Sequence, residues 1–322
     1  MSLDDVQWRG EEPCFRVLDT YFTLRYDDPL LGRYVEAVLA RFRVPPDPRE
    51  YRSPPTPNVP PRYSLRTVEA DGHGGGEASY QLYYGDTLMI DTPTTGRTLT
   101  HLFWHVNAEA VRQTGSFLLV HAGCVLAPSG RALLLPAQSG SGKTTLVTAL
   151  VQAGFGYLSD EAAVVDPVSG RIHPFPKALT LKSGSFELFP ELAGDHLGSL
   201  VPGTWHVDPG RLGPADVPTG AFPAGWVVAI GYDPTVDGAQ LSPMRAAEAV
   251  VEVGMSTLNL HRYRARALPL LADLARRTSA YRLRFASLEA ALEAITTLTA
   301  NDGHEAVTAP AMSPDVRFSA NL

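Results

Sequence analysis

The chain has 322 residues and a formal net charge of −7, and 44% of its residues are hydrophobic. This composition is typical of a folded globular protein and argues against a disordered chain. The acidic balance disfavours non-specific nucleic-acid binding, which depends on Lys and Arg contacts with phosphates. No window is apolar enough to predict a membrane span. We therefore expect neither a nucleic acid nor a membrane as a partner.

The opening residues, MSLDDVQWRG, are polar and acidic and do not resemble a signal peptide. The two cysteines, Cys14 and Cys124, are far apart in sequence. We expect reduced thiols, with one disulfide as the alternative. No Cys/His cluster has the spacing of metal ligands. These features together predict a cytoplasmic protein.

Residues 1–110 predict a small α+β domain, with a proline-rich extended connector near 45–62. This region holds no constellation of catalytic residue types. Its strands are expected at 15–26, 63–70 and 78–92, and its helices at 27–44 and 98–115.

Residues 111–300 predict a second domain, and 301–322 a frayed tail. Two apolar strands, 117–127 and 131–137, flank a turn and predict a hairpin. A helix from about 143 to 153 follows, ended by Gly154. The next expected elements are a strand at 156–159, a hairpin turning at 166–170, a long loop at 195–224, a strand at 225–232, and helices from about 243 to 299 around a strand at 280–285.

The strongest motif is A-Q-S-G-S-G-K-T-T at 137–145, which matches the phosphate-binding pattern G-x-x-x-x-G-K-[ST] except for Ala137 in place of the first glycine. A strand feeds a Gly-containing loop that opens a helix, so backbone N–H groups and the helix dipole can hold an anion. Lys143 would reach the β- and γ-phosphates, and the Thr144 hydroxyl would bind Mg²⁺. The alternative is a Gly/Ser-rich turn that happens to contain a lysine. The nucleotide-binding residues would be Gln138, Ser139, Gly140, Ser141, Gly142, Lys143, Thr144 and Thr145.

Asp160 and Glu161 end the strand at 156–159. Because a short crossover helix precedes it, this strand should run parallel to the strand before the phosphate loop, which places the acid pair beside that loop. One carboxylate could orient Mg²⁺ through water, and the other could accept a proton from a hydroxyl or position a water. The alternative is a solvated acidic turn. His121 lies on the neighbouring strand and could bond the catalytic acid, or it could be a structural histidine.

These residues resemble the catalytic domain of the HPr kinase/phosphorylase family. The match consists of His121 with Gly123, the S-G-x-G-K-[ST] loop at Ser139–Thr144, and the Asp160-Glu161 pair where the family has Asp-Asp. The close similarity covers about 117–185. Downstream segments are similar to divergent HPr kinase-related serine kinases, some of which modify ribosomally made peptides, including lasso peptides.

The resemblance implies an α/β fold related to phosphoenolpyruvate carboxykinase, with Mg²⁺ and ATP, or another nucleoside triphosphate, as cofactors. It implies Glu161 as the general base, Asp160 as support for the metal or the base, and His121 against the acid pair. A peptide or protein with a Ser hydroxyl would be the acceptor. A homo-oligomer is compatible with the family's assemblies.

Three more cations are weaker candidates for phosphate contact. Lys177 and Lys182 follow the hairpin and could neutralise charge on the γ-phosphate, or could be lysines of an exposed strand edge. Arg211, on the predicted long loop, could clamp a phosphate or be a surface residue. The leading function is therefore a serine kinase, with a small-molecule hydroxyl kinase and a non-catalytic nucleotide-binding regulator as the alternatives.

Overall fold

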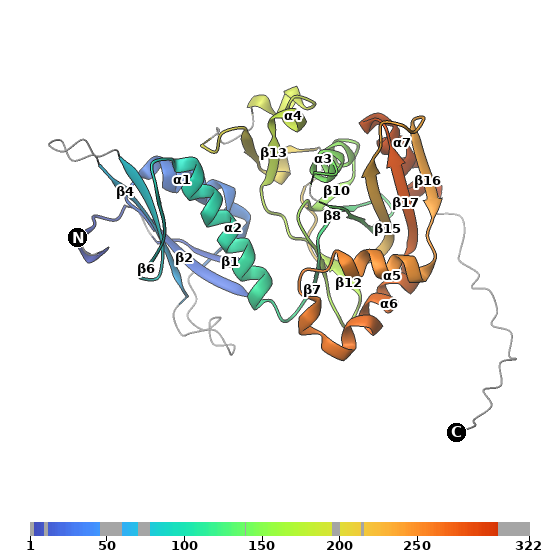
Figure 1. The fold of residues 1–322 in the computed structure, drawn as a ribbon, viewed down its shortest axis with the longest axis horizontal. Coiled ribbons are helices and arrows are strands. Elements are labelled where there is room, and N and C mark those ends of the chain that lie inside the picture. Colours follow the sequence, from blue (N-terminus) through green and yellow to red (C-terminus); the bar gives the residue numbers. More distant parts are fainter. Residues whose placement is uncertain are drawn as a thin grey trace, which may run out of the picture.

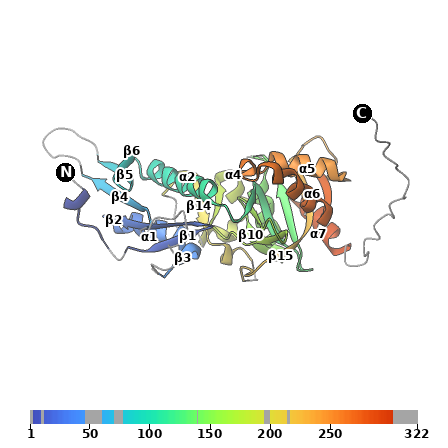
Figure 2. The ribbon, with the colours of Figure 1, turned by 90° about the horizontal axis from the view of Figure 1, so that it is seen from below.

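The computed structural model describes residues 3–9, 12–45, 60–69, 78–138, 140–194, 200–213 and 216–301. These residues form a mixed α/β structure with two main sheets that lie side by side along the longest axis of the molecule (Figure 1 and Figure 2). The predicted connector at 45–62 lies mostly outside the described residues, and the predicted tail lies almost entirely outside them. The domain boundary expected at residue 110 stays a prediction.

The N-terminal sheet has six described strands in the order β3-β1-β2-β4-β5-β6. Helices α1 and α2 pack their apolar residues, such as Leu31 and Leu102, into the core of this sheet. The same core includes Val164 and Phe175 from the second half of the chain, so the two halves share buried contacts. The elements are β1 (Cys14–Val17), β2 (Thr20–Tyr26), α1 (Pro29–Val38), β3 (Arg43–Val44), β4 (Arg62–Val68), β5 (Ser79–Tyr84), β6 (Thr87–Thr92) and α2 (Thr95–Gln113).

Three predictions in this region are wrong in detail. The single strand expected at 78–92 is a hairpin of β5 and β6, which turns at Gly85. The single strand expected at 15–26 is a hairpin of β1 and β2, turning at Leu18 with a positive φ of 57°. The helix expected at 27–44 ends at Val38, because the chain then makes a short 3₁₀ turn and enters β3, which pairs with β1. Asp28 caps the start of α1 by accepting backbone N–H bonds.

The second sheet has nine described strands, and the long strand β15 joins its parts. β15 pairs with β12 near its start and then with β9 and β17, both parallel to it. The elements are β7 (Leu118–Val120), β8 (Ala122–Leu126), β9 (Ala132–Pro136), α3 (Lys143–Gln152), β10 (Gly156–Ser159), β11 (Ala163–Val165), β12 (Arg171–His173), β15 (Phe222–Tyr232), β16 (Ala239–Pro243), α5 (Ala246–Met255), α6 (Ala267–Arg277), β17 (Ser279–Phe285) and α7 (Leu288–Asn301).

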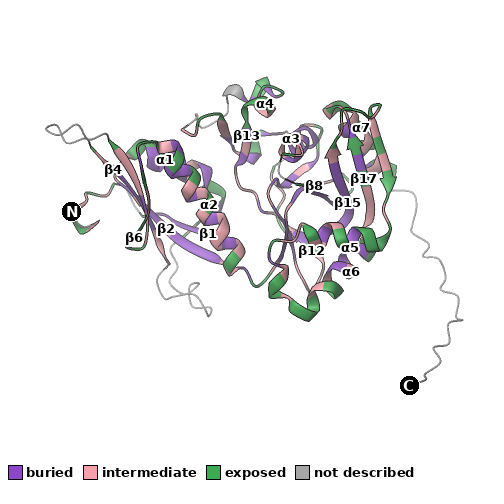
Figure 3. Ribbon diagram, viewed as in Figure 1, coloured by how far each residue is buried: buried purple, intermediate pink, exposed green. Residues whose placement is uncertain are grey.

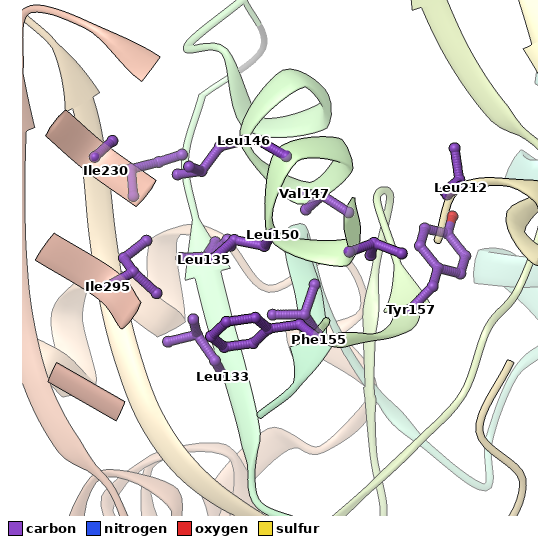
Figure 4. Packing of buried hydrophobic residues seen from close by; sticks show 14 of the residues in the cluster. Leu133, Leu135, Leu146, Val147, Leu150, Phe155, Tyr157, Leu212, Ile230 and Ile295 are labelled. Atoms are coloured by element: carbon purple, nitrogen blue, oxygen red, sulfur yellow. The ribbon is translucent and has the colours of Figure 1, made fainter. Parts of the chain in front are cut away.

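Helices cover both faces of this sheet. On one face α3 packs Leu146, Val147 and Leu150 against β9, in a cluster that also takes in Ile295 of α7 (Figure 4). On the other face α5 and α6 pack with β7 and β8 in a separate cluster. The central strands are therefore buried, while the outer surfaces of α5 and α6 are exposed (Figure 3).

The hairpin expected before the phosphate loop is confirmed, since β8 and β9 pair antiparallel. The strand expected at 117–127 is not continuous, because it breaks at His121 into β7 and β8. The backbone N–H of His121 donates to Ser256 outside the ladder, at 2.7 Å. β7 pairs with β11, whereas β8 pairs with β9 and β10, so His121 marks the crossing between two parts of the sheet.

The strand at 156–159 is confirmed as β10, and its direction matches the prediction. β10 runs antiparallel to β8, and β8 runs antiparallel to β9, so β9 and β10 point the same way with β8 between them. The hairpin expected at 166–170 is also confirmed by the pairing of β11 with β12. The carboxyl ends of β9 and β10 therefore meet at one edge of the sheet.

The long loop expected at 195–224 is partly wrong. Within it lies β14 (Thr204–Val207), which pairs with β13 (Leu179–Lys182) as a two-stranded ribbon. The short helix α4 (Ser183–Phe186) directly follows β13 and lies between the two strands in the chain. The rings of Phe186 and Trp205 stack with centroids 4.5 Å apart, which stabilises the ribbon through contacts distant in sequence. β16 was not expected, whereas the helices and the strand predicted between 243 and 299 are present as α5, α6, β17 and α7.

Candidate active site

The phosphate loop joins β9 to α3 and has the backbone that anion binding requires. Gly140 and Gly142 have φ angles of 85° and 84°, in the left-handed region that favours glycine. No heavy atom of the described chain lies within 4 Å of the point where a Cβ would sit on either glycine. The loop therefore faces open space, and α3 begins directly after Gly142.

Two further loop residues fit the same interpretation. The buried Ser141 hydroxyl makes no hydrogen bond with any residue that the structure describes. Ala137 does not have a positive φ, and its methyl group is buried in the core beside α3. The missing first glycine is thus compatible with the loop geometry. Ser139 lies outside the described residues.

Lys143 is nearly buried at the start of α3, and His121 holds its ammonium group. The two nitrogens His121 Nε2 and Lys143 Nζ are 2.8 Å apart, and Lys143 Nζ also donates to the carbonyl oxygen of Ala137 at 3.3 Å. His121 Nδ1 lies 3.0 Å from the carbonyl oxygen of Glu161, so Nδ1 carries the proton and Nε2 accepts from the lysine. Burial and the charge of Lys143 lower the pKa of His121, in agreement with a neutral ring.

His121 therefore contacts the acid pair through the backbone of Glu161. The sequence left two roles open for His121, a bond to the catalytic acid or a structural role, and the contact in the structure is to the backbone carbonyl of Glu161 rather than to either carboxylate. Gly123, two residues further along β8, has a separate role. A Cβ at this position would lie 2.6 Å from Val147 and 3.1 Å from Lys143, so glycine allows α3 to pack directly on β8.

Asp160 is buried at the end of β10, with both carboxylate oxygens engaged. The hydroxyl of Thr144 donates to Oδ2 at 3.3 Å, and the hydroxyl of Tyr157 donates to Oδ1 at 3.0 Å. Burial raises the pKa of Asp160, while the nearby ammonium of Lys177 opposes this change. The Thr144 and Asp160 oxygens thus converge on one point beside the phosphate loop.

Glu161 forms an ion pair with Lys177, whose Nζ lies 2.6 Å from Glu161 Oε2. Burial opposes the charge on Glu161, but Lys177, with smaller contributions from His121 and Lys143, holds its pKa below the usual value. The same interaction, with Asp160, raises the pKa of Lys177 despite its burial. Glu161 is therefore ionised and able to accept a proton.

One cavity of about 370 Å³ collects most of the predicted site residues. Lys177 lies behind Glu161, and Arg211 lies in an exposed 3₁₀ turn at Pro209–Arg211 that does not line the cavity. Thr180 and Ser185, which were not predicted, form part of the opposite wall, and Ser185 accepts a hydrogen bond from Thr145 at 2.8 Å. The lining residues are His121, Gln138, Gly140, Gly142, Lys143, Thr144, Thr145, Asp160, Glu161, Thr180, Lys182 and Ser185.

All lysines of the chain lie at or beside this cavity. The sequence contains only three lysines, Lys143, Lys177 and Lys182, against a total of 27 lysines and arginines. Two of the three line the cavity, and the third is paired with a glutamate that lines it. The cavity is therefore lined by two lysines and two acidic residues, with the third lysine paired to one of the acids, an arrangement suited to a polyanion with a divalent cation.

No group of three or more His, Cys, Asp or Glu residues in the described part of the chain could hold a metal ion by itself. A Mg²⁺ ion usually takes one or two protein ligands together with substrate phosphates and water. The Thr144 hydroxyl and the Asp160 carboxylate supply that small set of hard oxygen ligands. These residues fit a metal that arrives with its nucleotide.

The comparisons with known proteins add no family. A scan against protein-family models finds no match, and a search of the curated proteins finds none either. Within the described residues, no helix has the length and apolar character needed to span a membrane. The geometry of the cavity is therefore the main ground for any proposal about function.

Proposed function

We propose that this chain is a kinase that transfers the γ-phosphoryl group of ATP to a hydroxyl group, with Mg²⁺. The single observation that carries the proposal is the shared cavity, in which the phosphate loop and the acid pair face each other. A phosphate loop alone supports nucleotide binding. A buried carboxylate beside Thr144 and an ionised Glu161 at the same cavity support transfer as well.

The binding roles follow from position. The N–H groups at Gly140 and Gly142 and the start of α3 would hold the phosphates, and Lys143, oriented by His121, would contact the β- and γ-phosphates. Thr144 and Asp160 would hold Mg²⁺, which when bound neutralises phosphate charge. Lys182 on the opposite wall would contact the γ-phosphate from the other side.

In the reaction, the acceptor oxygen forms a bond to the γ-phosphorus as the bond from phosphorus to the bridging oxygen of ADP breaks. Glu161 accepts the proton that the hydroxyl loses, and ADP leaves with the electrons of the broken bond. Lys177 keeps Glu161 ionised before the acceptor arrives. Asp160 is the less suited of the two acids for the base role, because Thr144 and Tyr157 occupy both of its oxygens.

The proposal includes the HPr kinase/phosphoenolpyruvate carboxykinase-like fold and the family resemblance. They are supported by the order of the elements, in which His121 and Gly123 flank the start of β8, the phosphate loop follows the hairpin, and the acid pair ends β10. A Ser hydroxyl of a peptide or protein is the acceptor that this resemblance favours. A small-molecule hydroxyl is the alternative acceptor.

The test is transfer of radiolabelled γ-phosphate from Mg²⁺–ATP to a panel of Ser-containing peptides and small alcohols, with ADP release followed in parallel. Lys143→Met should abolish nucleotide binding, whereas Glu161→Gln should keep binding and lose transfer. Glu248→Gln, a matched change at the exposed start of α5, should behave as the wild type. Binding of ATP without transfer to any acceptor would favour a non-catalytic regulator, and full transfer by Glu161→Gln would exclude it as the base.

A further inference from the structure

Strand β10 contains a β-bulge immediately before the acid pair. Tyr157 pairs with Val125 of β8, but the next pair is Ser159 with Cys124, so the register shifts by one residue at Leu158. A bulge places two residues of one strand opposite one residue of the other and changes where the following side chains point. Bulges of this kind occur often beside active sites.

The bulge brings Tyr157 and Asp160 onto one face. In a regular strand, residues three apart point to opposite faces. Here the Tyr157 hydroxyl lies 3.0 Å from Asp160 Oδ1, and the ring is buried in the core cluster below α3 (Figure 4). The hydroxyl also lies 3.2 Å from the carbonyl oxygen of Lys177, but the charged carboxylate is the stronger acceptor.

Tyr157 holds one oxygen of Asp160 and leaves the other to Thr144, a residue that lines the cavity. Oδ1 is held from the core side by Tyr157, and Oδ2 faces Thr144 at 3.3 Å. The orientation of the carboxylate is thus fixed before any metal arrives.

Ser159 acts on the neighbouring acid through the backbone. Its buried hydroxyl oxygen accepts hydrogen bonds from the N–H groups of Glu161 at 3.1 Å and Ala162 at 3.0 Å. These two bonds form the turn that carries Glu161 out of β10. The carbonyl oxygen of Glu161 is then free to accept from His121.

We infer that Tyr157 and Ser159 are positioning residues with separate tasks. Tyr157 orients the Asp160 carboxylate toward the metal position at Thr144, and Ser159 orients the Glu161 backbone so that its carboxylate reaches the acceptor. The inference rests on the proposed function. It predicts that loss of the Tyr157 hydroxyl weakens metal binding. It also predicts that loss of the Ser159 hydroxyl weakens only the transfer step.

Tyr157→Phe tests the first task. Mn²⁺ binding is measured by electron paramagnetic resonance in the presence of a non-hydrolysable ATP analogue, so that no turnover is needed. Loss of a partner that orients a metal ligand typically weakens metal affinity by about 10–100-fold. Tyr83→Phe removes a comparable hydroxyl, which donates to Gln81 at 2.9 Å in β5, and should leave Mn²⁺ affinity unchanged.

An Asp160→Asn background shows whether Tyr157 acts through Asp160. If it does, adding Tyr157→Phe to Asp160→Asn should change Mn²⁺ affinity by less than about twofold, because coupled residues are not additive. Equal losses in both backgrounds would overturn the inference, as would wild-type Mn²⁺ affinity in Tyr157→Phe. The cycle keeps its meaning even if the single variants are less stable.

Ser159→Ala tests the second task. Mn²⁺ affinity and KM for ATP should stay at wild-type values while kcat falls by roughly tenfold or more, since a positioned base contributes about 10²–10⁴-fold. Ser287→Ala, which removes a hydroxyl that accepts from the N–H of Ala290 in α7, is the matched control. Weaker Mn²⁺ binding in Ser159→Ala, or an unchanged kcat, would overturn the division of tasks. If the wild type binds no Mn²⁺–nucleotide, the proposed function itself is wrong and the inference fails with it.

Discussion

His121 Nε2 accepts a hydrogen bond from Lys143 Nζ at 2.8 Å, so a neutral histidine orients the lysine of the phosphate loop. This arrangement needs the proton of the ring on Nδ1, where the carbonyl oxygen of Glu161 accepts it at 3.0 Å. The loop and the acid pair are therefore linked by one side chain at the break between β7 and β8. That link leads to the first prediction.

His121→Ala should weaken ATP binding by about tenfold, since a hydrogen bond to a charged group contributes roughly 1.5–3 kcal/mol. The loss follows because Lys143 keeps only the 3.3 Å contact with the Ala137 carbonyl. Isothermal titration calorimetry with Mg²⁺–ATP measures the change. His261→Ala, in an exposed turn, is the control, and equal affinities for the two variants would contradict the role of His121.

Ala137→Gly restores the glycine that the general phosphate-loop pattern has, yet it should not improve ATP binding. Ala137 has no positive φ, so glycine gains nothing there, and stability should fall by roughly 1 kcal/mol through lost burial and added chain entropy.

Gly142→Ala should instead weaken binding by about tenfold, because its φ of 84° costs an L-residue roughly 1–2 kcal/mol. Chemical denaturation and calorimetry separate the two effects.

Mg²⁺–ATP should protect lysines from amine acylation in the wild-type protein. Lys182 is exposed and should react fastest without nucleotide, whereas Lys177 should react slowest, because it is only partly exposed and its ion pair with Glu161 raises its pKa. Addition of Mg²⁺–ATP should slow modification of Lys182 and Lys143, which line the cavity. Mass spectrometry gives the rates, with the N-terminal amine as internal control. Unchanged rates at both cavity lysines would exclude phosphate binding at this site.

Acid should destabilise the protein partly through His206, whose ring accepts from or donates to the Tyr34 hydroxyl at 2.6 Å. Burial, with a smaller contribution from Lys177, lowers its pKa from 6.5 to about 4. Between those values the unfolded chain binds a proton that the folded chain does not, so stability is full above pH 6.5 and falls toward pH 4. The slope reaches about 1.4 kcal/mol per pH unit.

The measurement is denaturant unfolding at pH 7, 6 and 5. His206→Gln should lose part of this slope, so that the stability difference from the wild type narrows as the pH falls. Tyr34→Phe keeps the histidine and should keep the slope. A constant difference between the wild type and His206→Gln across the three pH values would contradict the prediction.

The parts of the site that the sequence predicted are those determined by residues close together in the chain. The hairpin before the loop, the glycine turns, the start of α3 and the acid pair all depend on neighbouring residues. The direction of β10 followed from chain connectivity, although β8 between β9 and β10 did not. Whether alanine is tolerated at position 137 depends on the backbone φ angle there, which the sequence does not give.

The parts that the sequence missed depend on distant pairing. The β13–β14 ribbon puts Thr180 opposite His206, and no local pattern connects these segments. The buried Asn259 side chain bonds the backbone of Leu119 and Phe117 and so fixes β7 before His121, again between segments distant in sequence. For Ser185, which lines the cavity, the one hint in the sequence is the run of small residues at 183–185.

The strand β8, which lies between β9 and β10, also sets the distance between the phosphate loop and the acid pair. Neighbouring strands are about 4.8 Å apart, so the carboxyl ends of β9 and β10 are separated by roughly 10 Å. If β9 and β10 were direct neighbours, these two ends would be only about 5 Å apart. The middle strand acts as a spacer, and its glycine at position 123 lets α3 rest on it. A redesign that removed this spacer would bring the phosphate loop and the acid pair closer together, even with every side chain of the cavity retained.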